Sequence, residues 1–121
     1  MQPLGVHHVS INVSDPARSL VFYTGVLGAR VRDDRPDFSI GGAWLDMGST
    51  QVHLIEASVP PAQGQHFALL LDDLDAVVDE LRAKGIEVDD PKVVGPDRQT
   101  FVHDPDGNAI ELHQIGTAGR S

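Results

Sequence analysis

The chain has 121 residues, of which 40% are hydrophobic and none is cysteine, and its formal net charge is −9 at pH 7. These values are typical of one soluble globular domain, and the absence of cysteine excludes disulfides, zinc-thiolate sites and thiol nucleophiles. The negative charge argues against nucleic acid or a membrane surface as partner. Because the sequence has no signal-peptide pattern and no apolar run of about 18 residues, we expect a cytoplasmic protein.

Apolar and polar side chains alternate over residues 6–13, which predicts a strand with one buried face. Asp15 and Pro16 then predict the start of a helix that Gly28 would end. Three further strands are expected at residues 29–34, 38–47 and 50–57. The first half therefore predicts the order strand, helix, strand, strand, strand.

Residues 59–65 contain two prolines and a glycine, which predicts a linker between two halves. The same order of elements is expected again after it. The second half predicts a strand at 65–71, a helix that follows Asp72 or Asp73 and ends at Gly85, and strands at 86–89, 98–102 and 109–114. We therefore expect an α+β fold of two tandem βαβββ modules, with the first at 1–58, the linker at 59–65, the second at 66–116 and a tail at 117–121.

Four side chains that can bind a metal occupy matching positions in the two halves. His66 follows His8 by 58 residues, and Glu111 follows His53 by the same interval. Side chains alternate along a strand, so each of the four should lie opposite the apolar face that packs on a helix. The two modules would then form a curved, cup-like mixed sheet with a helix outside each module and the four side chains inside.

This set of three imidazoles and one carboxylate suits one divalent ion, namely Zn, Ni, Co, Mn or Fe(II). A single histidine on a strand is usually structural, but four candidates at repeated positions favour a metal site. His7 and His103 lack this support and are interpreted as surface or turn residues. His113 shares the predicted face of Glu111 and is a candidate for the rim of the site.

Several motifs resemble the vicinal oxygen chelate superfamily, which includes glyoxalase I, methylmalonyl-CoA epimerase, extradiol dioxygenases, fosfomycin-resistance transferases and bleomycin-binding proteins. The motifs are residues 8–15 (HVSINVSD), Phe22-Tyr23 with Leu27-Gly28, residues 66–69 (HFAL) and residues 104–111 (DPDGNAIE). The resemblance implies paired βαβββ modules, a divalent metal in the cup and frequent homodimers. It also implies ligand roles for His8, His53, His66 and Glu111, which match the superfamily's positions on the first, fourth, fifth and eighth strands.

A fourth ligand favours the isomerase and lyase branch, whose reaction is metal-assisted proton transfer next to a carbonyl of a small-molecule substrate. Glu111 is the candidate base in such a reaction, and the alternative is that it serves only as an anionic ligand. Glyoxalase I has an arginine four residues after its first ligand, where this chain has Asn12, and an asparagine where this chain has Ala57. We therefore do not expect dependence on glutathione.

Other polar and aromatic residues are candidates for contact with the substrate. Trp44 stands where the epimerases carry a second glutamate base, so two-base epimerisation is not expected. Core packing is an alternative role for Trp44 and Phe101. The substrate-binding candidates are Ser10, Asn12, Trp44, Arg98, Phe101 and His113.

Two other classes of function stay open at this point. One is an extradiol-type dioxygenase that uses iron(II) and does not use His53 as a ligand. The other is a non-catalytic protein of the bleomycin-resistance type that sequesters a cationic drug in an acidic cup. A site formed within one chain and a site formed by exchange of halves between two chains are both compatible with the short linker.

Overall fold

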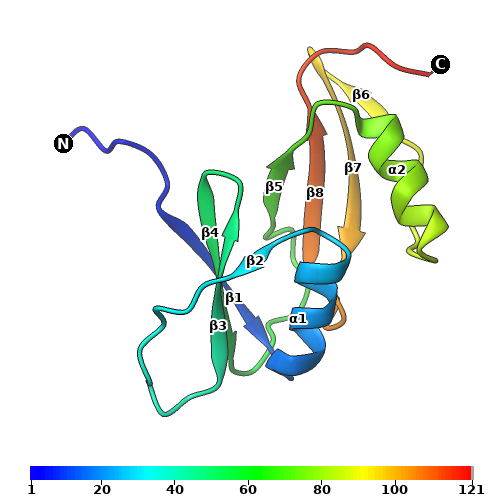
Figure 1. The fold of residues 1–121 in the computed structure, drawn as a ribbon. Helices are drawn as coiled ribbons and strands as arrows, with labels where there is room; N and C mark the ends of the chain where they lie inside the picture. The colour runs from blue at the N-terminus through cyan, green and yellow to red at the C-terminus, as the bar shows by residue number, and fades with distance from the viewer. Residues whose placement is uncertain (121) are drawn as a thin grey trace. The chain divides into compact units, whose positions relative to one another are not determined.

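The structure is a computed structural model that describes residues 1–120 (Figure 1). The described chain divides between Pro61 and Ala62 into two compact units. We call them the N-terminal unit and the C-terminal unit. Each unit contains one helix and one four-stranded sheet, which confirms the predicted α+β fold of tandem βαβββ modules.

The N-terminal unit contains β1 (His8–Val13), α1 (Pro16–Gly25), β2 (Arg30–Val31), β3 (Gly42–Met47) and β4 (Thr50–Glu56). The order of its strands is β1-β4-β3-β2. The β1 and β4 strands are parallel, and the other pairs are antiparallel, so the sheet is mixed. The apolar face of this sheet packs against α1, which contacts β3 and β4.

Local sequence explains the limits of α1. The Asp15 carboxylate accepts hydrogen bonds from the backbone N–H groups of Ala17 and Arg18, and Pro16 occupies the first turn. Gly28 has a φ of 76°, in the left-handed region that glycine tolerates at the end of a helix. The helix itself ends at Gly25, three residues earlier than Gly28.

The C-terminal unit repeats this plan with β5 (Phe67–Leu70), α2 (Leu74–Ala83), β6 (Lys92–Val94), β7 (Asp97–His103) and β8 (Ala109–Gln114). The order of its strands is β5-β8-β7-β6, with β5 parallel to β8. Its core joins the apolar residues of α2 to one face of the sheet; the fully or almost fully buried residues are Leu74, Val78, Leu81, Val102, Ile110 and Leu112.

The two sheets have the same register at their parallel pairs. Ser10 in β1 lies opposite His53 in β4, and Ala68 in β5 lies opposite Glu111 in β8. Because these residues are related by the interval of 58 that separates the candidate ligands, the repeat seen in the sequence extends to the pairing of the strands.

The sixth strand differs from its prediction. Residues 86–89 form no strand, and β6 lies at Lys92–Val94 instead. The Val88 carbonyl accepts hydrogen bonds from the Arg82 guanidinium, and the Asp89 carbonyl accepts one from the Thr100 hydroxyl. Because side chains already occupy these carbonyls, and Pro91 has no N–H to donate, the segment does not join a strand ladder.

The third strand starts later than predicted, at Gly42 instead of residue 38. Ser39 has a φ of 59°, which is not a strand conformation, and its N–H binds the Asp37 carboxylate. The Arg35 guanidinium also donates to the Ile40 carbonyl. Residues 32–41 therefore form a loop. None of the helices within residues 1–120 combines the length and apolar character needed to cross a membrane.

Candidate functional site

In the N-terminal unit, β1 and β4 bring two predicted ligands together. The His8 and His53 rings are stacked, with centroids 3.9 Å apart and planes at 12°. Trp44 pairs with His53 across β3 and β4 and stacks on its other side at 4.5 Å. These three rings lie on the sheet face opposite the buried Val52 and Leu54, as strand alternation predicts.

His53 is only 8% exposed because it lies between two rings. Burial lowers its pKa from the ordinary value of 6.5, and electrostatic interactions with His8, His7 and nearby arginines act in the same direction. The imidazole of His53 is therefore held in the neutral form, which is the form that binds a metal. The His53 Nε2 lies 2.9 Å from the Gln51 side-chain oxygen, which can accept a hydrogen bond from it.

In the C-terminal unit, the His66 Nε2 lies 3.1 Å from the Glu111 Oε1. His66 immediately precedes β5, and its Nδ1 lies 2.8 Å from the Gly64 carbonyl oxygen. Because a carbonyl oxygen can only accept a hydrogen bond, Nδ1 of His66 is the donor in this contact. In a neutral His66, a lone pair on Nε2 therefore faces a carboxylate oxygen. Two acceptors at this distance need a cation or a proton between them.

The second oxygen of Glu111 is held by a separate chain of hydrogen bonds. His113 Nδ1 lies 2.7 Å from Glu111 Oε2, and His113 Nε2 lies 2.8 Å from Asp97 Oδ2. Hydrogen bonds to Asp97 and then to Glu111 raise the pKa of His113, so the imidazolium donates from both nitrogens. The N–H of Gly116 and then His113 lower the pKa of Asp97, which keeps it ionised.

The residues present fit a divalent metal. Each unit brings together two of the four predicted ligands on its helix-free face, and the donors are imidazole and carboxylate groups. The approach of His66 Nε2 to Glu111 Oε1, at 3.1 Å, places an imidazole nitrogen and a carboxylate oxygen side by side. No group of three or more such ligands is gathered within the described residues 1–120, so each unit by itself provides one pair.

The remaining candidates are not all on the same faces. Ser10 lies across from His53, and Asn12 donates a 2.9 Å hydrogen bond to the Ser58 carbonyl. Phe101 lies across from Glu111, with its ring edge to face with His66 at 5.1 Å. The structure thus brings Ser10 and Trp44 beside His53, and Phe101 and His113 beside Glu111.

Arg98 lies on the other face of its sheet. It is 4% exposed, and its guanidinium makes two hydrogen bonds of 3.0 and 3.1 Å with the Asp75 carboxylate of α2. Thr100 and Val102 lie on this same helix-side face, since they alternate with Phe101. The structure therefore does not bring Arg98 together with the other substrate-binding candidates.

A cavity of about 520 Å³ adjoins the ring stack and is lined only by residues of the N-terminal unit. Its walls include Trp44 and His53, together with Arg35, Phe38 and Ile40 from the loop before β3. These three loop residues could not be predicted from the sequence, because residues 32–41 have no regular period. Asp97 was not predicted either, although strand alternation puts it on the same face of β7 as Phe101.

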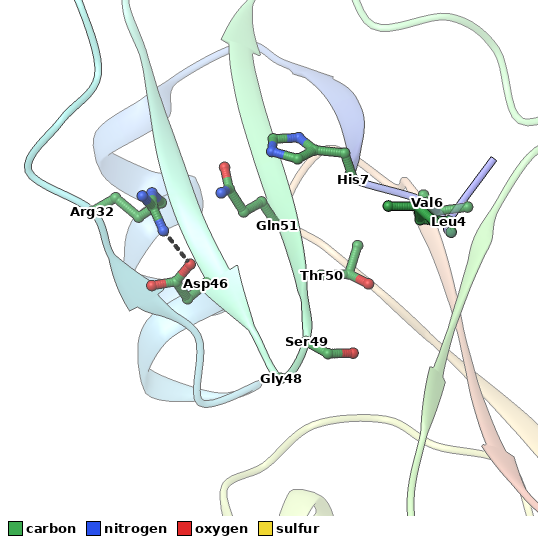
Figure 2. A pocket seen from close by; sticks show the side chains of 10 residues that line it. Leu4, Val6, His7, Arg32, Asp46, Gly48, Ser49, Thr50 and Gln51 are labelled. Atoms are coloured by element: carbon green, nitrogen blue, oxygen red, sulfur yellow. Dashed lines mark hydrogen bonds and ion pairs between the residues drawn. The ribbon is translucent and has the colours of Figure 1, made fainter.

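A second cavity, of about 670 Å³, lies beside the turn between β3 and β4 (Figure 2). Its lining includes His7 and Gln51 but neither His8 nor His53. Its charged residues, Arg32 just after β2 and Asp46 in β3, form an ion pair of 2.8 Å, as Figure 2 shows. Because this pair satisfies both charges, and no predicted ligand lines the cavity, we assign the candidate site to the other cavity.

Tandem βαβββ modules with metal-competent pairs on their helix-free faces define a protein of the vicinal oxygen chelate type. Residues 5–112 match the Glyoxalase/Bleomycin resistance protein/Dioxygenase superfamily, and the chain belongs to this family.

The chain is similar along most of its length to several relatives. The uncharacterized protein YwkD of Bacillus subtilis is 35% identical, over 90% of this chain and 95% of YwkD. Lactoylglutathione lyase of Salmonella typhimurium is 31% identical, over 93% of this chain and 94% of the lyase. The structure of TnmS3, an antibiotic binding protein from a Streptomyces species, is 28% identical with a TM-score of 0.78, over 96% of this chain and 99% of TnmS3.

Proposed function

We propose that this protein is a divalent-metal-dependent isomerase or lyase of the glyoxalase type. The proposal depends most on one observation: both units pair their predicted ligands, His8 with His53 and His66 with Glu111. The similarity to a lactoylglutathione lyase supports this class of reaction. The substrate would be a small metabolite with two neighbouring oxygens, one of them a carbonyl.

The four residues would bind one ion between them, two from each unit. The units of one chain or the units of two chains in a homodimer would provide the same ligand set. When bound, a divalent ion supplies Lewis acidity toward the substrate oxygens and favours loss of the neighbouring carbon-bound proton.

Glu111 would accept that proton and return it to the adjacent carbon, so the substrate is isomerised without net oxidation. His113 holds Glu111 Oε2 at 2.7 Å, which leaves Oε1 to face His66 and the reacting groups. Asn12 is uncharged and already donates to the Ser58 carbonyl, so it offers no cation for the glutathione carboxylate. We therefore propose a reaction that does not depend on glutathione.

Elemental analysis of the purified protein tests the metal. We expect about one divalent ion per chain and a large loss of metal affinity in His53→Ala, but no loss in His103→Ala, which removes an exposed histidine that is not a predicted ligand. Full occupancy and affinity in His53→Ala would contradict the four-ligand proposal.

The chemistry is tested separately with α-hydroxyketones and hemithioacetals in deuterated water. Incorporation of deuterium next to the carbonyl is expected in wild type. In Glu111→Gln, we expect incorporation to fall by at least about 100-fold, the typical contribution of a general base, even in protein reloaded with metal. Oxygen consumption with catechols, and no deuterium incorporation, would instead indicate the iron(II) dioxygenase.

A non-catalytic binding function is the second candidate, and two observations favour it. TnmS3 is an antibiotic binding protein of similar fold, and the cavity beside Trp44 has a mainly aromatic and aliphatic wall. Tight binding of a drug by protein that stays metal-free and inactive would support this candidate over the enzyme.

A further inference from the structure

The cavity beside the ring stack has a largely apolar wall. The stacked Trp44, His53 and His8 rings are parallel within 12° at each contact and form one side of it. Phe38 faces Trp44 with centroids 6.1 Å apart, and Ile40 adds an aliphatic surface. The volume of about 520 Å³ is in the usual range for small-molecule pockets.

The charge of this cavity is opposite to that of the chain. The protein has 18 acidic residues against 9 basic ones. However, among residues 1–120 the lining of the cavity contains Arg35 and three histidines and no Asp or Glu. A cationic ligand would therefore meet an arginine here instead of the acidic surface expected from the composition.

Arg35 is available to an anion. Its Nη2 donates one hydrogen bond of 2.9 Å, to the Ile40 carbonyl, and its Cζ lies 5.1 Å from the centroid of the Phe38 ring. No ion pair joins Arg35 to a carboxylate within residues 1–120. Arg32, nearby in sequence, differs because Asp34 and Asp46 already bind it. A guanidinium has five N–H donors, so most of those of Arg35 stay available.

We infer that this cavity binds small carboxylates with an apolar body, the carboxylate on Arg35 and the apolar body beside Trp44, Phe38 and Ile40. The Ile40 carbonyl and the Phe38 ring hold the guanidinium in place before the ligand arrives. This preorganisation reduces the entropic cost of forming charged hydrogen bonds to the carboxylate. The inference rests on the proposed function at one point only: both take this cavity as the place where the body of the substrate binds.

Three probes of one shape and different charge test the inference: cinnamate, its neutral amide cinnamamide and the cation cinnamylamine. Binding is measured by calorimetry and by the fluorescence of Trp44, the only tryptophan in the chain. The protein is first treated with chelator, so that no metal can bind the carboxylate. We expect cinnamate to bind about tenfold tighter than cinnamamide, the equivalent of one charge-assisted interaction, and cinnamylamine to bind weakest.

Arg35→Gln should abolish the preference for cinnamate and leave the affinity for cinnamamide unchanged. Arg35→Lys should keep part of the preference, because it keeps the charge and loses the planar fork. The matched control Arg30→Gln removes an exposed arginine of β2 that does not line the cavity, and it should keep the full preference. Trp44→Leu should weaken both cinnamate and cinnamamide.

Equal affinity for cinnamate and cinnamamide, or an unchanged preference in Arg35→Gln, would overturn the inference. Because the chelated protein contains no metal, that failure would leave the proposed metal-dependent reaction unaffected. Conversely, full metal affinity in His53→Ala would contradict the proposed metal site and leave binding of the carboxylate intact.

Discussion

Glu111 has different partners at its two oxygens, and the difference fixes how the side chain is presented. Oε2 accepts a hydrogen bond from His113, which Asp97 orients from the other side, while Oε1 faces His66. Asp97 is itself anchored, since its Oδ1 accepts the N–H of Gly116 at 2.9 Å. We infer that His113 positions Glu111 and does not itself bind the metal.

We predict that His113→Leu lowers the metal affinity about 10- to 100-fold, the usual effect of removing a residue that orients a ligand. Asp97→Asn should give a smaller loss, because an amide oxygen can still accept from His113. Competition with a chelator measures the affinities. The control His103→Leu should bind metal like wild type, and a folded His113→Leu with unchanged affinity would contradict this role.

Strand alternation predicts which face of a sheet a side chain lies on, and therefore which residues reach the site. It correctly put His53 and Glu111 on the helix-free faces. The same alternation puts Arg98 on the helix-side face with Thr100 and Val102, so it does not support the predicted pocket role for Arg98. Its partner Asp75 lies 23 residues earlier in the chain. No local pattern in the sequence therefore indicates that Arg98 pairs with a buried carboxylate.

At the scale of elements, the two glycines at the end of α1 have different roles. Gly28 has a φ of 76°, whereas Gly25 is a helical residue of ordinary φ, and the position of a Cβ would be unobstructed at both. We predict that Gly28→Ala destabilises the protein by about 1 kcal/mol, and that Gly25→Ala stabilises it by about 0.5 kcal/mol. Urea unfolding measures both, and a change of the same sign in the two variants would contradict the prediction.

The segment after β8 is tied to α2 and β7 by Asp75. This carboxylate binds the Arg98 guanidinium and the backbone N–H of Arg120, while the Arg120 side chain binds Asp79. The predicted tail at 117–121 is therefore in contact with the helix as far as Arg120. The hydrogen bonds from Arg98, and then from Arg120, lower the pKa of Asp75 below its ordinary value of 3.8.

The pH dependence of this connection has a definite sign. Because the folded-state pKa of Asp75 is below its unfolded value, its stabilising effect is complete above about pH 4 and is lost as the pH falls through the folded-state pKa. We predict that Asp75→Asn lowers the urea midpoint at pH 7, and that the difference from wild type shrinks by pH 3. The exposed Asp72→Asn should resemble wild type at both pH values.

The predicted strand at 29–34 is reduced to Arg30–Val31, while the differences at β3 and β6 share one physical cause. Backbone carbonyls at Ile40, Val88 and Asp89 accept hydrogen bonds from side chains of Arg35, Arg82 and Thr100, respectively. Those contacts depend on tertiary structure, while the strand periodicity of a sequence reports only alternating burial. The strands with a clear apolar face, such as β4 and β8, were predicted within one residue of their limits.

For the whole molecule, the repeat makes equivalent positions in the two units comparable by experiment. We predict that His8→Ala and His66→Ala reduce metal occupancy to a similar extent, since each removes one imidazole from one pair. Elemental analysis measures occupancy, and light scattering measures the mass, for which we expect a homodimer. A loss confined to one unit's variant would contradict a site shared equally between units.

A mixture of His53→Ala and Glu111→Ala chains then identifies how the units combine. If a site uses the units of two chains, each mixed dimer regains one intact set of four ligands, and occupancy recovers. If a site uses one chain, every site still lacks a ligand, and the mixture binds no better than its components.

The shared register of the two sheets, with Ser10 opposite His53 and Ala68 opposite Glu111, has an evolutionary implication. A half-length ancestor with this geometry could have formed a two-fold symmetric site from two identical copies, with the same residue at both β4-type positions. Joining two such copies in one gene would allow those positions to diverge, and in this chain they are His53 and Glu111. Such a divergence would let one half take the role of a base, as proposed for Glu111.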